Sequence, residues 1–182
     1  MGRRNYLIEG VSGTGKTSVC KELQRRGFHA INGDTELAYQ GDPQTGEPLT
    51  GPGSHWQHIW PVDRVRTLVA DHTAPVTFFC GGSRNNHRFV DLFDEVFVLD
   101  IDLATLNCRL DARPDEFGAT GEERELVVRL HRTGEGLPEG GVLIDATRPL
   151  AEVVDAILLR TAGDDDLDGL VAWSDAHVDL DD

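Results

Sequence analysis

The chain is poor in lysine: Lys16 and Lys21 are the two lysines among its 17 basic residues, and the others are arginines. Acidic residues number 32, so the formal net charge is −15. A surplus of negative charge on this scale argues against nucleic acid or an anionic membrane as the main partner. A phosphate site must therefore be a local positive region, and the planar, bidentate arginine side chain is the main donor available to build it.

Cysteine is also scarce. Cys20, Cys80 and Cys108 are odd in number and form no C-x-x-C pair, which argues against disulfides or a thiolate metal site and predicts a reducing compartment. No apolar run approaches the length that spans a membrane, and residues 1–4 lead directly into the first apolar segment, so we expect a cytoplasmic protein. At 182 residues with 39% hydrophobic content, the chain suits a single domain.

The segment GVSGTGKT, residues 10–17, fits the phosphate-binding pattern G-x-x-x-x-G-K-[ST] at every fixed position. Residues 6–8 before it predict a buried strand, and residues 17–26 predict a helix. Glycine-rich backbone can curl its N–H groups around a phosphate, and the helix N-terminus adds a favourable dipole. Lys16 is then placed to bridge the β- and γ-phosphates and Thr17 to ligate Mg²⁺. The predicted nucleotide contacts in this loop are Gly10, Ser12, Gly13, Thr14, Gly15, Lys16, Thr17 and Ser18.

Asp34 follows a second predicted strand, residues 28–31, at the edge of the sheet where open α/β folds bind ligands. It is a candidate general base, or a Mg²⁺ ligand acting through water. The alternative is an N-cap for a helix over residues 35–39.

Residues 41–54 are rich in proline and glycine, so they predict a long mobile loop that covers an acceptor substrate. Trp56 and Trp60, four residues apart, could line a pocket or pack against the sheet, and we favour packing. His55 and His58 could form a metal pair, but no third ligand is in reach.

Val76–Cys80 predicts a central strand, which ends at Gly81 and Gly82. Arg84 and Arg88 follow at helical spacing on one face, which makes a second corner that could bind an anion. Arg88 could equally form a surface ion pair with a nearby aspartate.

The remaining pattern continues the alternation of strands and helices. It predicts a strand over residues 94–100, a helix over Leu103–Asp111, and a lid over residues 114–121. After the lid come an arginine-bearing helix over residues 122–133, a strand over residues 142–144 and a closing helix over residues 150–160. We therefore expect a three-layer α/β domain over residues 1–162, with a five-stranded parallel sheet and helices on both faces. Residues 163–182 predict a flexible acidic tail.

From Tyr6 to about Arg160 the chain resembles the small P-loop kinases of the gluconate kinase and shikimate kinase group. The loop of residues 10–17 is very close to the gluconate kinase version, and Asp34 falls on the second aspartate of that group's Asp-x-Asp pair, with Asn32 in place of the first. Residues 80–83, CGGS, resemble the glycine-rich acceptor segment of shikimate kinases. Aligned to gluconate kinases instead, the same region matches Arg88 to an arginine of theirs.

This resemblance implies the strand order 2-3-1-4-5 and a nucleoside-monophosphate-kinase-like P-loop fold. It implies that Arg109 and Arg113 contact ATP phosphates, that Arg148 lies in the turn that stacks on adenine, and that Asp34 takes the proton of the acceptor hydroxyl. By position along the chain, the predicted acceptor contacts are Asp34, Gly81, Gly82, Arg84, Arg88 and Arg129.

The predicted function is ATP- and Mg²⁺-dependent transfer of the γ-phosphoryl group to a small molecule, with Lys16, Asp34, Arg109 and Arg113 as the catalytic residues. A nucleoside or nucleoside monophosphate kinase is an alternative, since Arg64, Arg66, Arg84 and Arg88 could pair on a phosphate-bearing acceptor. A non-catalytic, nucleotide-binding regulatory module is an alternative of another class. We expect a monomer or homodimer, with neither nucleic acid nor membrane as a partner.

Overall fold

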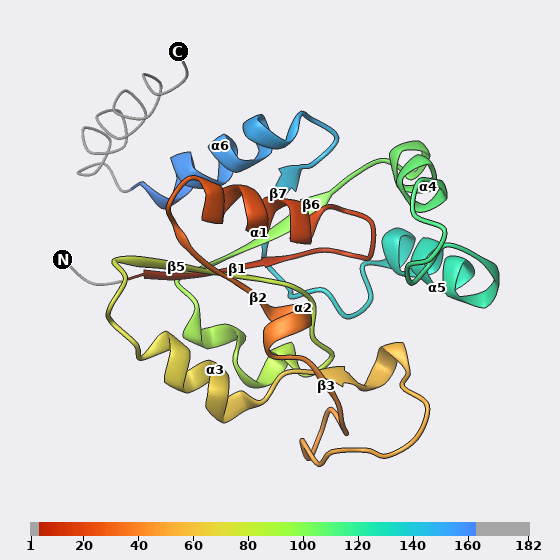
Figure 1. Ribbon diagram of the computed structural model, residues 1–182, viewed down its shortest axis with the longest axis horizontal. Helices are drawn as coiled ribbons and strands as arrows, with labels where there is room; N and C mark the ends of the chain where they lie inside the picture. Colours follow the sequence, from red (N-terminus) through yellow and green to blue (C-terminus); the bar gives the residue numbers. More distant parts are fainter. Residues whose placement is uncertain (1–3, 163–182) are drawn as a thin grey trace.

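Five parallel strands form the centre of the computed structural model, which describes residues 4–162 (Figure 1). They are β1 (Arg4–Glu9), β2 (His29–Asn32), β5 (Val76–Cys80), β6 (Glu95–Asp100) and β7 (Val142–Asp145). Their order in the sheet is β2-β5-β1-β6-β7, and every neighbouring pair is parallel. Counted along the chain this is the order 2-3-1-4-5, so the predicted topology is confirmed. The predicted acidic tail lies outside the described residues.

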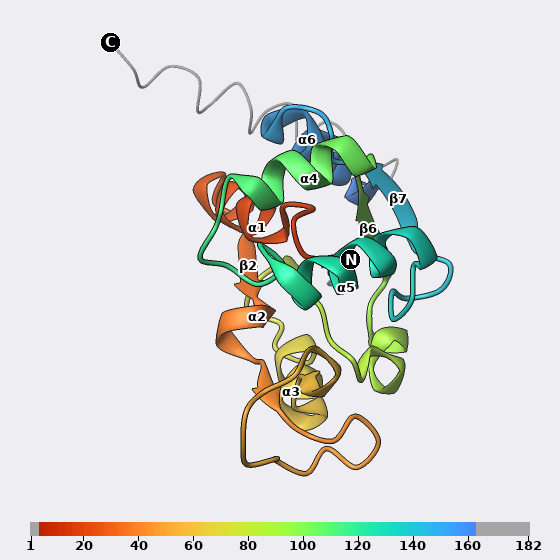
Figure 2. The ribbon, with the colours of Figure 1, turned by 90° about the vertical axis from the view of Figure 1, so that its right-hand side faces the viewer.

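Helices cover both faces of the sheet, as predicted (Figures 1 and 2). Helices α1 (Lys16–Arg25) and α6 (Leu150–Thr161) lie on one face, and α3 (Val62–Val69) lies on the other. Beyond the carboxyl ends of the strands stand α4 (Leu103–Asp111) and α5 (Gly121–Thr133). Within residues 4–162, no helix combines the length and the apolar character needed to cross a membrane.

Alternate residues of each central strand pack against the helices on opposite faces of the sheet. Tyr6 and Ile8 of β1 belong to the cluster that includes α1 and α6, whereas Leu7 between them belongs to the cluster on the α3 side. All three are buried. Successive side chains of a strand point to opposite faces, so a sheet buried on both faces needs apolar residues at every position.

The observed helices and strands match some of the predicted boundaries and differ at others. Val76–Cys80 and Leu103–Asp111 are confirmed to the residue, but the helix predicted over residues 35–39 is wrong: α2 covers Gly33–Glu36 only. The chain then enters β3 (Tyr39–Gln40), which pairs antiparallel with β4 (His58–Ile59). The segment between these two strands, residues 41–57, is hereafter the insert.

The insert lacks regular strands, as its composition predicts, but internal bonds organise its first half. Gly41 and Pro48 form an isolated antiparallel bridge. The Tyr39 hydroxyl donates to the carbonyl of Gly46 at 2.6 Å. A short 3₁₀ turn, His55–Gln57, then leads into β4.

The helix expected to carry Arg84 and Arg88 is absent, and two short 3₁₀ turns, Asn86–Arg88 and Val90–Leu92, replace it. Side chains of this segment bond instead to the backbone of Trp60, which is distant in the sequence. The backbone N–H of Trp60 donates to Ser83 Oγ and Asn85 Oδ1, both at 3.1 Å, and Asn85 Nδ2 donates to the Trp60 carbonyl at 2.9 Å. Short polar side chains that bind backbone compete in this way with helix formation.

Trp60 packs in the core, as predicted, and stacks on Phe89 with ring centroids 5.7 Å apart. Its indole lies against two glycines: a Cβ on Gly33 would fall 2.0 Å from Trp60 Cζ2, and a Cβ on Gly81 would fall 2.8 Å from the same atom. Trp56 differs from the prediction, because 40% of its surface stays exposed.

We expect Gly33→Ala to destabilise the protein by about 1–3 kcal/mol, because the added methyl overlaps the Trp60 ring and forces the core to shift. Urea denaturation measures this loss. In a Trp60→Phe background, which removes the benzo part of the indole that carries Cζ2, the same substitution should cost less. Equal costs in the two backgrounds would show that the contact with Trp60 is not the cause.

Candidate active site

The loop between β1 and α1 curls over the carboxyl end of β1. Gly13 and Gly15 have φ values of 96° and 108°, a region that favours glycine, and a Cβ on Gly13 would lie 2.8 Å from Leu106 Cδ1. Gly15 is the N-cap of α1. The first N–H groups of α1 have no acceptor within the helix and therefore suit an anion.

Two cationic side chains, Lys16 and Arg113, donate hydrogen bonds to this loop. Lys16 Nζ donates to the carbonyls of Gly10 at 2.7 Å and Val11 at 3.2 Å, and burial lowers its pKa. Arg113 Nη2 donates to Ser12 Oγ at 2.8 Å, while its Nε is buried with no hydrogen-bond partner among the described residues. Donors held in this way, one of them unpaired, fit the phosphates of a nucleotide.

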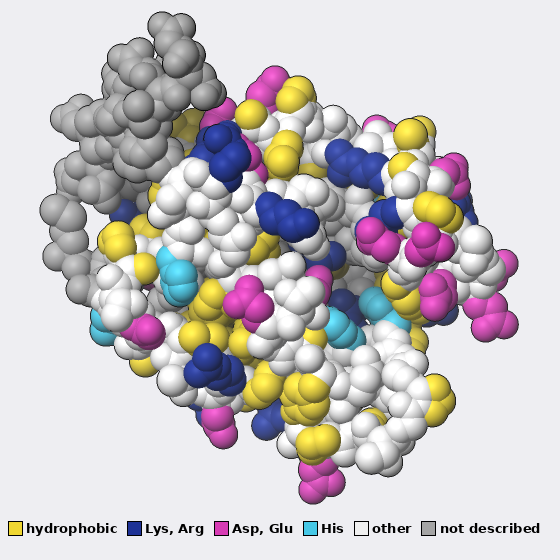
Figure 3. Space-filling view, viewed as in Figure 1, with side chains coloured by type: hydrophobic (Ala, Val, Ile, Leu, Met, Phe, Trp, Pro, Cys, Tyr) yellow, Lys and Arg dark blue, Asp and Glu magenta, His cyan; other side chains and the backbone are white. Residues whose placement is uncertain are grey.

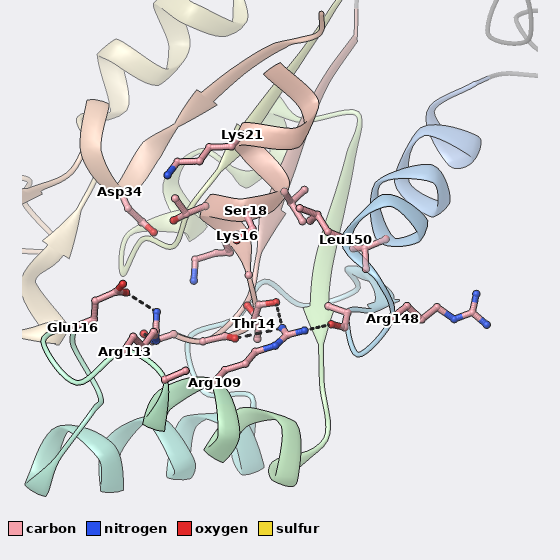
Figure 4. A pocket seen from close by; sticks show the side chains of 18 residues that line it. Thr14, Lys16, Ser18, Lys21, Asp34, Arg109, Arg113, Glu116, Arg148 and Leu150 are labelled. Carbon is pink, nitrogen blue, oxygen red and sulfur yellow. Dashed lines mark hydrogen bonds and ion pairs between the residues drawn. The ribbon is translucent and has the colours of Figure 1, made fainter. Parts of the chain in front are cut away.

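A cavity of about 700 Å³, the loop cavity, opens beside these groups (Figure 4). Arg109 lies along its wall, and its guanidinium donates to the carbonyls of Thr14 at 2.9 Å and Ala146 at 2.7 Å. Arg109 therefore ties the loop to the turn after β7. Arg148 also borders the cavity, but Figure 4 shows its side chain pointing away from Lys16. Lys21 borders the loop cavity as well, although its position in the sequence gave no reason to place it there.

Asp34 stands across the cavity from the loop (Figure 4). Its Oδ1 accepts the N–H of Gly82 at 2.9 Å and lies 3.2 Å from His58 Nε2. Burial alone would raise its pKa, but the His58 hydrogen bond, the charge of Lys16 and the Gly82 N–H together lower the pKa below its ordinary value. The N-cap alternative is wrong, because α2 begins at Gly33 with Asn32 as its cap.

A second cavity of about 690 Å³, the insert cavity, lies on the other side of Asp34. His58, Gly82 and Arg84 form one wall. In Figure 3, dark blue and cyan side chains gather in a hollow between the α4–α5 lobe and the rest of the molecule. Residues of the insert and of α5 also line it: Gly53, Ser54, His55, Trp56, Glu122, Glu123, Leu126 and Leu130. Ser12, Lys16 and Asp34 border both cavities, so the two meet at these side chains.

Residues 7–129 of the sequence, from β1 into α5, match the model of the AAA domain family. The chain belongs to the AAA domain family. The matched segment includes the loop, Asp34, the insert and the residues after β5. A comparison of this chain with curated proteins finds no match.

Solved structures with the same fold as this AAA domain include three kinases. A sugar kinase from Janibacter sp. HTCC2649 is 20% identical, with 87% of this chain and 94% of that chain covered and a TM-score of 0.53. A gluconokinase from Sinorhizobium meliloti 1021 is 21% identical, with 88% and 95% covered and a TM-score of 0.50. A shikimate kinase from Aquifex aeolicus is 15% identical, with 86% and 95% covered and a TM-score of 0.55. The AAA domain thus has the fold of the small P-loop kinases, as predicted.

The predicted acceptor arginines of the AAA domain lie in different places. Arg84 lines the insert cavity. Arg88 lies outside both cavities, with Nη1 3.2 Å from the position of a Cβ on Gly46. Arg129 also lies outside them, with Cζ 5.9 Å from the centroid of the Trp56 ring. Gly81 lies where a Cβ would come within 2.8 Å of Asp34 Oδ1, so only glycine lets the aspartate approach.

Sequence reasoning missed two titratable groups of the AAA domain. The sequence marks His58 only as half of a metal pair. Glu9, the last residue of β1, is 1% exposed; its Oε1 accepts the N–H of Ser83 at 3.1 Å, and its Oε2 has no hydrogen-bond partner in the described part of the chain. Burial raises the pKa of Glu9 to about 7, although the nearby charge of Arg84 opposes this rise. The sequence signal for Glu9 was its position, a single acidic residue between a core strand and the glycine loop.

We expect Glu9→Gln to stabilise the protein increasingly as the pH rises. In the unfolded chain this carboxyl ionises near pH 4.5, but the folded protein keeps its proton to about pH 7, so folding becomes less favourable across that window. The advantage of the glutamine variant should therefore grow by about 2–3 kcal/mol between pH 5 and pH 8. Urea denaturation of both proteins measures it, and the exposed Glu47→Gln controls for the loss of one charge. An advantage that stays constant with pH would contradict the burial argument.

Proposed function

We propose that this protein transfers the γ-phosphoryl group of ATP to a hydroxyl of a small acceptor. The observation that carries the proposal is the junction of the two cavities at Lys16 and Asp34. A phosphate-binding loop opens into one cavity and an ionised carboxylate faces the other. Phosphoryl transfer requires this arrangement, because positioning and electrostatic stabilisation supply most of its catalysis.

The loop cavity would hold the nucleotide. Backbone N–H groups of residues 13–18, with Lys16 and Arg113, would bind the phosphates, while Arg109 keeps the loop in place. Within residues 4–162 no group of three or more His, Cys, Asp or Glu side chains is arranged to hold a metal, so a Mg²⁺ ion would take few protein ligands: the Thr17 hydroxyl directly and Asp34 through water. When bound, Mg²⁺ neutralises charge on the phosphate oxygens.

Asp34 and His58 would orient the acceptor hydroxyl. Because the pKa of Asp34 is lowered, the carboxylate is ionised at neutral pH and is a weak base. It would accept a hydrogen bond from the hydroxyl in the ground state and take the proton late, as a loose transition state requires. The Gly82 N–H would keep the carboxylate pointed into the junction.

The arginines favour a hydroxyl acceptor over a phosphate-bearing one. Of the four that could have paired on a second phosphate, Arg84 lines the insert cavity. Arg64 and Arg66 are exposed on α3, and Arg88 lies beside Gly46. A single arginine does not form the paired clamp expected for a nucleoside monophosphate.

We expect Asp34→Asn to lower acceptor-stimulated ADP release by about 100-fold, because the hydroxyl loses its carboxylate partner. The affinity for Mg-ATP should stay within about threefold, since the phosphate donors remain. A coupled ADP assay and calorimetry measure the two quantities. Asp63→Asn, an exposed change on α3, is the matched control. Unchanged stimulated turnover would remove Asp34 from the proposed mechanism.

We expect Lys16→Ala to weaken Mg-ATP binding by about 10- to 100-fold, the usual effect of losing a charge-assisted hydrogen bond to phosphate. Calorimetry measures this loss. If instead Mg-ATP binds tightly to the wild type, is hydrolysed slowly and no acceptor accelerates it, the protein is a nucleotide-binding regulatory module.

A further inference from the structure

The insert cavity has an aromatic wall built from the insert and from the segment before α5. The rings of His55 and Phe117 stack with centroids 5.6 Å apart and planes 10° apart, and Trp56 meets His55 edge-on at 5.3 Å. Leu126, Leu130 and Leu137 continue the lining. A wall of this kind suits the flat face of a ring.

His55 adds an uncharged polar atom to this wall. Burial, reinforced by the nearby charge of Arg84, lowers its pKa to about 4, so the ring is neutral at physiological pH. Its Nε2 is buried and has no hydrogen-bond partner in the part of the chain that the structure describes. An uncharged imidazole nitrogen can pair with a hydroxyl or amino group of a ligand.

Carboxylates outnumber cations around the same cavity. Asp34, Glu122, Glu123 and Glu135 line it, against Lys16 and Arg84. Lys16 is turned to the carbonyls of the loop. Arg84 has three acidic groups near enough to act on its charge, namely Glu9, Asp34 and Glu135. The negative charge is therefore concentrated on the side of the cavity formed by α5 and the segment after it, where Glu122, Glu123 and Glu135 stand.

We infer that the acceptor is a ring-bearing alcohol without negative charge, either uncharged or cationic; this inference rests on the proposed phosphoryl transfer. The hydroxyl reaches Asp34 and the ring lies on the aromatic wall. Hydroxyl or amino groups on the far side of the ring face Glu122 and Glu135. A carboxylate or phosphate on the acceptor would lie beside these glutamates, and such like-charge contacts select against it.

Matched pairs of compounds test the inference, each pair differing in one negative charge: a nucleoside and its 5′-monophosphate, an amino sugar and the corresponding sugar acid, and a cyclic hydroxy acid and its carboxamide. We expect the member without negative charge to give a kcat/KM for ADP release about tenfold or more above its acidic counterpart in the pair that contains the best acceptor. Calorimetry with a non-hydrolysable ATP analogue present should rank the affinities in the same order.

A double variant tests the origin of the selectivity. Glu122→Gln with Glu135→Gln should lower the ratio of kcat/KM values several-fold, about as expected for removing two charges at a cavity rim. Glu125→Gln with Glu139→Gln is the matched control: both glutamates are exposed, neither lines the cavity, and the change in net charge is the same. Its ratio should remain that of the wild type.

Two results would overturn the inference, and they differ in what else they remove. In the first, the acidic member of the best pair is the better substrate, and this preference is lost in Arg84→Gln. Arg84 then binds the anion of the acceptor, so the inference fails while the kinase proposal stands. If no compound accelerates ADP release and Asp34→Asn behaves as the wild type, the proposed function fails and the inference fails with it.

Discussion

The contact between the Trp60 indole and two glycines determines where Asp34 and Gly82 stand. Gly33 precedes Asp34, and Gly81 precedes Gly82. The Trp60 ring lies on both glycines, so it fixes the distance between the Asp34 carboxylate and the Gly82 N–H that donates to it. Ser83 and Asn85 hold the backbone of Trp60 in turn. A packing constraint in the core thus sets the geometry of the junction, because close-packed interiors yield little to displacement.

Phe117 connects the parts that surround this junction. Its carbonyl accepts the Ser12 hydroxyl at 3.3 Å, and its ring stacks on His55 of the insert. The segment predicted as a lid therefore contacts both the phosphate loop and the insert. The aromatic wall of the insert cavity exists because two segments far apart in the sequence, the insert and the segment before α5, meet there.

The sequence predicted the parts whose signals are local. The loop pattern specified its own position, and the short length and the β-branched and aromatic content of Val76–Cys80 favoured a buried strand. His58 could not be found in this way, since its partner Asp34 is 24 positions away and the β3–β4 pairing that joins them is too short to leave a periodic pattern. The helical spacing of Arg84 and Arg88 misled because Ser83 and Asn85 bond to Trp60 instead of continuing a helix.

Arg109 has a consequence for the thermodynamics of ligand recognition. By bonding to the carbonyls of Thr14 and Ala146, it joins the glycine loop to the turn after β7, at the edge of the sheet. The entropy lost in ordering the loop is then part of the folding free energy. A nucleotide bound as proposed would meet a loop that is already ordered, so more of its contact energy would remain as affinity.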